Sequence, residues 1–139
     1  MLTVRWLRCL LILILAIVAG VPALSYEEEV GKVLFLVVEK GEVVASNVLA
    51  GRFDRLELHA KERILDYKVA NAVAVVVTNQ RYAAYGALTG GWQDIRRRAG
   101  ERMESMDVQD YAANVLTTDR ILNFYARTGS WSETRRTVQ

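Results

Sequence analysis

Two runs of arginine are the strongest candidates for binding chemistry in this sequence. Their members are Arg96, Arg97, Arg98, Arg135 and Arg136. A row of guanidinium groups can bind phosphate, sulfate or carboxylate groups, because each planar fork presents paired N–H donors. The alternative is a solvated strand whose charges pair with neighbouring acids such as Asp94, Glu101 or Glu133. The five arginines are therefore candidate contacts for an anion or a partner, and both interpretations stay open.

Residues suited to catalysis or metal binding are sparse. His59 is the only histidine and Cys9 the only cysteine, and Cys9 lies in the leader described below. One imidazole without thiols excludes the common zinc patterns, and no nucleophile elbow, phosphate-binding glycine loop or calcium loop occurs. The scattered acids Asp54, Glu57 and Glu62 could still supply a carboxylate pair. The sequence thus predicts no catalytic residue, no cofactor and no metal.

The second half of the chain repeats with a period of 39 residues. Residues 72–97 and 111–136 align without a gap, and ten of the 26 positions are identical. The matches include Thr78 with Thr117, Arg81 with Arg120, Gly90 with Gly129, and Trp92 with Trp131. A weaker copy precedes them, in which Gly51 matches Gly90 and Phe53 matches Trp92. Self-similarity at this period indicates tandem structural repeats.

Three units follow from this period, within one domain spanning residues 24–139. They cover residues 32–70, 71–109 and 110–139, and the last one lacks the stretch that matches residues 101–109. Residues 24–31 have about the length of that stretch. They either complete the last unit or form a solvated arm that carries three consecutive glutamates.

Each unit has the pattern of four short strands. Apolar runs over residues 33–38, 72–77 and 112–116 lack clean alternation and predict the first strand of each unit, buried on both faces. A polar break suited to a tight turn follows each run. A second strand is predicted over residues 81–86 and 120–125, and a third strand follows each glycine turn. A fourth strand is predicted over residues 63–69 and 102–108. A helix over residues 99–114 is the competing interpretation. The matching segment contains Ile64, Tyr67 and Val69, which favour a strand.

Four short strands in about 40 residues is the size of one β-propeller blade. The spacing of Tyr85, Thr89 and Trp92 resembles that of kelch repeats, and the Thr-Gly turn before the tryptophan resembles quinoprotein-type repeats. The double glycine of kelch repeats and the usual aspartate of quinoprotein repeats are missing. The resemblance implies a blade-like architecture and transfers no activity.

The predicted fold is therefore all-β, with three tandem four-stranded antiparallel blade-like repeats. These form a partial β-propeller or a propeller completed by a second chain. A β-trefoil is the alternative, because it also contains three four-stranded repeats. An open arc of blades leaves an edge strand at each end, which favours self-association.

The start of the chain predicts export. Arg5 and Arg8 precede an apolar run over residues 9–21, so residues 1–23 resemble a secretory signal peptide. The run is shorter than the roughly 20 residues that span a bilayer, which favours cleavage over an uncleaved anchor and predicts no membrane insertion afterwards. Without those two arginines, the 18 basic residues fall to 16 and match the 16 acids. A neutral chain lacks the basic surface that nucleic-acid binding requires.

The sequence therefore predicts a secreted or periplasmic, non-catalytic β-repeat protein. It would act as a binding or interaction module in the cell envelope or outside the cell, with a protein partner or through self-association. Carbohydrate is a further candidate ligand, because Trp92 and Trp131 could stack on sugars, although packing between the units is the alternative role for these rings. Two other functions stay open. One is an envelope enzyme or enzyme subunit acting on a polysaccharide, and the other is a remnant of a longer repeat array.

Overall fold

The computed structural model describes residues 32–137 of the chain. The predicted signal peptide and residues 24–31 lie outside this range, so their assignments stay predictions. Regular structure in the described range consists of eleven β-strands. No helix in it is long and apolar enough to cross a membrane.

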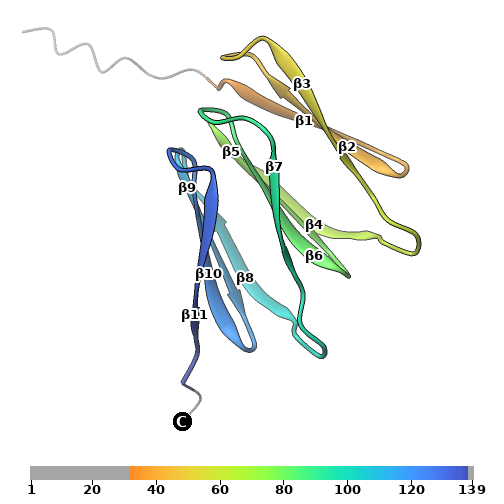
Figure 1. Cartoon of the computed structure of the whole chain (residues 1–139), viewed down its shortest axis with the longest axis vertical. Helices are drawn as coiled ribbons and strands as arrows, with labels where there is room; N and C mark the ends of the chain where they lie inside the picture. Colours follow the sequence, from red (N-terminus) through yellow and green to blue (C-terminus); the bar gives the residue numbers. More distant parts are fainter. Residues whose placement is uncertain (1–31, 138–139) are drawn as a thin grey trace, which may run out of the picture.

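The strands form three antiparallel sheets, each a simple meander (Figure 1). The first sheet contains β1 (Leu34–Glu39), β2 (Glu42–Asn47) and β3 (Arg52–Glu57). The second contains β4 (Ile64–Val69), β5 (Val73–Thr78), β6 (Arg81–Gly86) and β7 (Trp92–Arg96). The third contains β8 (Met103–Val108), β9 (Ala112–Thr117), β10 (Arg120–Tyr125) and β11 (Ser130–Arg135). The all-β, blade-like architecture is thus confirmed, and the segment that could have been a helix, residues 99–114, contains β8 and the start of β9.

Each four-stranded sheet takes its first strand from the preceding sequence unit. Strand β4 pairs with β5, and β8 pairs with β9. Both pairs contain an irregularity at the same place, between Ile64 and Asp66 in one and between Met103 and Ser105 in the other. Each four-stranded sheet therefore begins one strand before its sequence unit does. The pairing of β4 and β8 with the next unit joins consecutive units through backbone hydrogen bonds.

The core lies between the sheets, which are arranged as a fan with the second sheet in the middle (Figure 1). All side chains of β5 and β6 are buried, because this sheet is covered on both faces. Small residues permit the close approach: a Cβ atom added to Gly86 would lie 3.1 Å from the Cα atom of Ala126 in the third sheet. In β10 buried and exposed side chains alternate, since the third sheet is covered on one face by the second. Burial on both faces is therefore confirmed for residues 72–77. It is wrong for residues 33–38 and 112–116, because within residues 32–137 the first and third sheets are each covered on one face only.

The two tryptophans after the glycine turns have the same surroundings. Trp92 packs edge-on against Tyr85 and Trp131 packs edge-on against Phe124, both with ring centroids 5.4 Å apart. The Trp92 indole donates to the carbonyl oxygen of Asp54 at 3.2 Å, on the preceding sheet. The Trp131 indole does the same to Gln93 at 3.0 Å. These rings pack between adjacent sheets, which is the packing role that the sequence offered as an alternative to sugar stacking.

The glycines of the repeated turns offer a matched test of packing between sheets. Gly51 and Gly129 have nearly equal positive φ angles, 63° and 62°. A Cβ atom on Gly51 meets nothing within 4 Å, whereas one on Gly129 would overlap the Thr89 hydroxyl of the second sheet. We expect Gly51→Ala to lower the free energy of unfolding by about 1–2 kcal/mol through backbone strain alone. Gly129→Ala should lower it further, because Thr89 must move; equal losses in chemical denaturation would contradict this contact.

Candidate functional site

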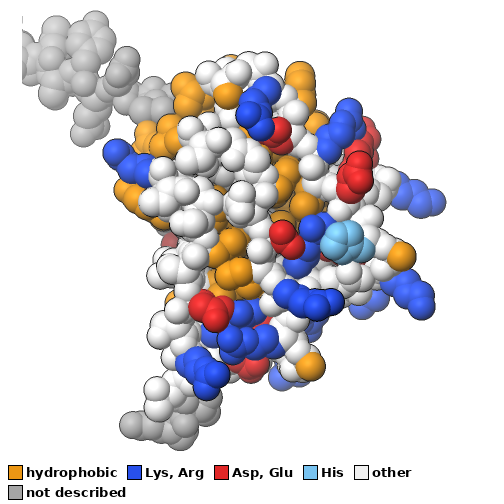
Figure 2. Space-filling view, in the orientation of Figure 1, with side chains coloured by type: hydrophobic (Ala, Val, Ile, Leu, Met, Phe, Trp, Pro, Cys, Tyr) orange, Lys and Arg blue, Asp and Glu red, His pale blue; other side chains and the backbone are white. Residues whose placement is uncertain are grey.

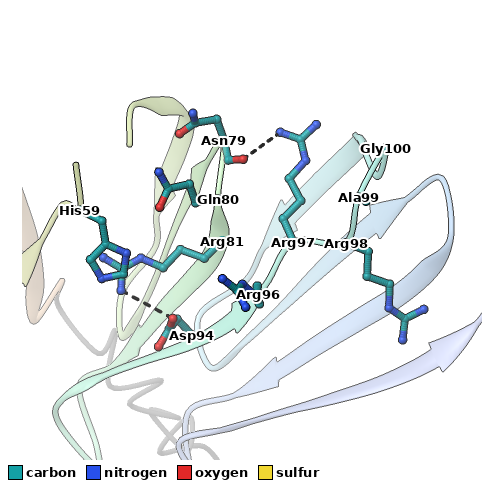
Figure 3. Close-up of a pocket in the computed structure, with 10 residues that line it drawn as sticks. All are labelled: His59, Asn79, Gln80, Arg81, Asp94, Arg96, Arg97, Arg98, Ala99 and Gly100. Atoms are coloured by element: carbon teal, nitrogen blue, oxygen red, sulfur yellow. Dashed lines mark hydrogen bonds and ion pairs between the residues drawn. The ribbon is translucent and has the colours of Figure 1, made fainter. Parts of the chain in front are cut away.

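A cavity of about 540 Å³ opens at the end of the second sheet where the β5–β6 turn meets the end of β7. We call it the arginine cavity. Its lining residues come from three segments that are distant in sequence (Figure 3), namely His59, Asn79, Gln80, Arg81, Asp94, Arg96, Arg97, Arg98, Ala99 and Gly100. The space-filling view shows the single histidine among Lys and Arg side chains with a few acids between them (Figure 2). The charged side chains of the cavity lining are therefore predominantly basic.

A buried ion pair forms one wall of the arginine cavity. The Arg81 Nε atom donates to Glu62 Oε1 at 2.8 Å, and the Thr78 hydroxyl donates to the same oxygen at 2.8 Å. The backbone amide of His59 donates to the second oxygen, Oε2, at 2.7 Å. Arg81 also reaches the preceding sheet, where it donates to the carbonyl oxygen of Glu57 at 2.6 Å. We call this set of contacts the Glu–Arg–Thr clasp.

The clasp occurs a second time, 39 residues later. Arg120 donates to Glu101 through Nε at 2.9 Å, and the Thr117 hydroxyl donates to Glu101 at 2.8 Å. The Arg98 amide takes the place of the His59 amide, at 3.1 Å from Glu101 Oε1. Arg120 likewise reaches back to the last carbonyl oxygen of β7. The repeat alignment matched the threonine and arginine of the two clasps but assigned them no joint role. The glutamate, threonine and arginine have the same spacing in both units, and this shared spacing could have indicated their contact.

The clasp keeps both glutamates ionised. Burial alone would raise the pKa of Glu62 and of Glu101. Hydrogen bonds from the arginine, the backbone amide and the threonine outweigh burial, so each pKa lies below its ordinary value. Neither carboxyl group carries a proton at neutral pH that it could donate to a substrate. The two acids therefore stabilise the fold as anions.

The remaining guanidinium groups of the cavity differ in how far their charge is compensated. Arg98 forms an ion pair with Glu133 at 3.2 Å. Arg97 donates to two backbone carbonyl oxygens, those of Glu101 and Asn79, and forms no ion pair with a carboxylate within residues 32–137. Arg96 is exposed at the end of β7, and its guanidinium group has no hydrogen-bond or ion-pair partner in that range. Arg96 and Arg97 are thus the cations that a ligand could still engage.

Of the five arginines predicted to contact an anion or a partner, three lie together in the structure and two lie elsewhere. Arg96, Arg97 and Arg98 line the arginine cavity, whereas Arg135 and Arg136 do not. Arg135 is exposed on the last strand. Arg136 bonds to Glu104 at 2.6 Å and to the Thr117 carbonyl oxygen at 2.8 Å. The candidate anion site is therefore a local cluster rather than a row across the repeats.

The other predicted polar candidates have structural contacts. His59 is exposed, and its Nδ1 atom lies 3.6 Å from Glu62. Asp54 forms an ion pair with Arg52 at 2.7 Å and accepts a hydrogen bond from Tyr85. The hydrogen bond from Arg52 is the main reason that the pKa of Asp54 lies below its ordinary value, against the opposing effect of burial. In the part of the chain that the structure describes, no three His, Cys, Asp or Glu residues gather into a metal site.

Comparison with known proteins gives only weak matches. No family model matches the chain, and no curated protein matches it. The N-terminal domain of Nup159 is 16% identical with a TM-score of 0.40, over 75% of this chain and 30% of that chain. A chain from the S. cerevisiae complex of Dbp5 with Nup159, Gle1, IP6 and ADP is 17% identical with a TM-score of 0.38, over 72% of this chain and 29% of that one. The chain spans less than a third of these structures, and the fold assignment rests on its own sheet topology.

Loss of one member of the clasp should destabilise the protein severely. Arg120→Met leaves the Glu101 carboxylate buried without its partner, so we expect the free energy of unfolding to fall by about 3–5 kcal/mol. The exposed Arg63→Met exchange is the control and should change it by less than about 0.5 kcal/mol. Chemical denaturation measures both variants. A loss at Arg120 no larger than that of the control would show that the clasp contributes nothing.

The clasp also predicts how stability depends on pH. A carboxyl group whose pKa is lowered on folding stabilises the protein above its unfolded pKa, near 4.5, and this contribution is lost as the pH falls through the folded pKa. We therefore expect the free energy of unfolding to decrease with acidification below about pH 4.5. Glu101→Gln should reduce this acid slope, whereas Glu57→Gln, at an exposed position, should preserve it. Equal slopes in all three proteins would contradict the assignment.

Proposed function

We propose that this chain is an exported, non-catalytic interaction module whose arginine cavity binds an acidic segment of a partner protein. The observation that carries the proposal is the pair Arg96 and Arg97, whose charges meet no carboxylate within residues 32–137. A planar guanidinium group in this state can form two parallel hydrogen bonds to one carboxylate or phosphate group. An open cavity between turns suits a side chain or a short segment of a partner.

The charges around the cavity support an anionic ligand. Four guanidinium groups line it, and three carboxylates contact them: Glu62 and Asp94 contact Arg81, and Glu133 contacts Arg98. Four guanidinium groups against three carboxylates leave a net charge of +1. A ligand with one negative charge would therefore neutralise the site.

The acids of the described range support a binding role over a catalytic one. Glycosidic cleavage needs one carboxyl group that holds a proton at working pH and a second carboxylate beside it. Asp54, Glu62 and Glu101 have lowered pKa values and hold arginine, tyrosine or threonine side chains. The export part of the proposal rests on the signal-peptide pattern of residues 1–23. A polysaccharide-acting enzyme has no comparable support among these residues.

A peptide-binding measurement tests the role of the cavity. The purified protein is titrated into a fluorescein-labelled hexaglutamate peptide at low salt, with heparin as a second probe. Arg96→Ser should weaken peptide binding about tenfold or more, because one charge-assisted bidentate contact is lost. Arg127→Ser is the control, since it removes one exposed positive charge from the turn between β10 and β11, at the other end of the strands.

The pattern of losses separates the alternatives. Selective loss in Arg96→Ser supports the cavity as the site. Equal loss in Arg127→Ser would indicate general charge attraction and contradict a defined site. Loss in Arg135→Ser of the same size as in Arg96→Ser would point to the longer arginine row that the sequence suggested. Binding of heparin without binding of the peptide would replace the protein partner with an acidic polysaccharide.

A further inference from the structure

The outer face of the first sheet is an exposed apolar surface, which we call the β1–β3 face. Its apolar side chains are Phe35, Val37, Val44 and Phe53, which lie on the same side of three neighbouring strands, with Ser46 and Arg55 among them. Phe35 is 44% exposed, Val37 49% and Phe53 72%. A shallow hollow of about 350 Å³ is lined by Val37, Val44 and Phe53 together with the charged Glu39 and Arg55. Clustered apolar side chains of this kind mark interaction surfaces.

The repeat period shows what this face does elsewhere in the molecule. The residues 39 positions later are Ala74, Val76, Ala83 and Trp92, and they pack against the first sheet. The residues after a further 39 positions are Ala113, Val115, Leu122 and Trp131, and they pack against the second sheet. The corresponding face therefore docks on a neighbouring sheet in both other blades. In the first blade the same face has Phe35 where the other blades have alanine and Phe53 where they have tryptophan. Within residues 32–137, no sheet lies on top of it.

The opposite end of the fan does not complement this surface. The outer face of the third sheet presents Asn114, Asn123 and Ser132 side by side across its middle, and all three side chains are exposed. Ile121 and Tyr125 lie in the rows on either side, so this face is mixed, with its polar groups at the centre. A ring closed head to tail would bury these polar groups against valine and phenylalanine, at a cost for every hydrogen bond left unmade. The β1–β3 face of a second copy offers an apolar surface instead.

The charges at the ends of the β1–β3 face are complementary to one another. At one end the Lys32 ammonium group lies 5.2 Å above the centre of the Phe35 ring. At the other end stand Glu39, Glu42 and Glu57, of which Glu42 is paired with Arg55. Two copies stacked face to face with their strands antiparallel bring the cationic end of each over the acidic end of the other. β1 then crosses β1, and Lys32 meets Glu39 of the second copy.

We propose that two copies of this chain associate through their β1–β3 faces in a symmetric, antiparallel, face-to-face dimer. The same surface serves both partners, as in most two-fold dimers. Six-residue strands about 20 Å long, in three rows about 5 Å apart, give a smaller contact than the roughly 800 Å² per partner of a stable complex. The dimer should therefore be reversible, with a dissociation constant on the order of micromolar.

Sedimentation velocity over a concentration series tests the proposal on the purified protein. We expect a monomer–dimer equilibrium that Phe53→Arg shifts at least about tenfold towards monomer, because the substitution puts a charge in place of the most exposed apolar side chain of the contact. Asn123→Arg is the matched control, since it places the same charge at the middle of the opposite face. Tryptophan fluorescence and a cooperative melt confirm that each variant is folded.

A charge exchange tests the antiparallel orientation. Lys32→Glu should weaken the dimer several-fold, and the double variant Lys32→Glu with Glu39→Lys should restore it, because the two charges meet across the dimer. A wild-type protein that stays monomeric at every concentration would overturn the proposal and leave the face to another occupant. Dissociation by Asn123→Arg as well as Phe53→Arg would replace it with head-to-tail ring closure. Failure of the double variant to recover would overturn the orientation.

Discussion

The fold depends on the Glu–Arg–Thr clasp, in which each buried glutamate pairs with an arginine whose side chain is at least nine-tenths buried. Glu62 and Glu101 lie in the connections between sheets, whereas Arg81 and Arg120 open the second strand of the following hairpin. Each arginine also bonds to the last residue of the preceding sheet. One guanidinium group thus fixes the connection, the hairpin and the neighbouring sheet relative to one another. A buried carboxylate tolerates few other arrangements, because every unmade hydrogen bond to it is costly.

This constraint bears on the proposed binding site. At the end of the second sheet the clasp uses Arg81, so the proposed ligand would contact the arginines that follow β7. Glu62 and Glu101 are engaged as anions in the clasp. The first unit has Glu39 and Glu42 where the later units have the threonine and arginine of the clasp. The first sheet is still joined to the second by Arg81, which bonds to Glu57, together with apolar packing and the Trp92 contact.

Much of the local structure was readable from the residues. The 39-residue period correctly predicted the strands around the glycine turns, and the apolar run over residues 72–77 correctly predicted a strand buried on both faces. The like surroundings of Trp92 and Trp131 follow from the same period. The pairing of β4 with the following unit was not readable, because the period fixes the spacing of strands but not which neighbour supplies their hydrogen bonds. The clasp was missed for the same reason, since its members are up to 19 residues apart.

The sequence alone determined the strand content, the repeat length and the positions of the turns, because these depend on nearest-neighbour patterns of apolar, polar and glycine residues. Only the tertiary structure decided which charges are neutralised. Arg96, Arg97 and Arg98 are chemically identical in the sequence, but one pairs with Glu133, one bonds to carbonyl oxygens and one stays exposed. It also decided that Phe53 is exposed while Trp92 and Trp131 are packed, since burial depends on whether a neighbouring sheet covers that position. Charge compensation and burial are properties of the packed sheets, and the linear order of residues does not specify them.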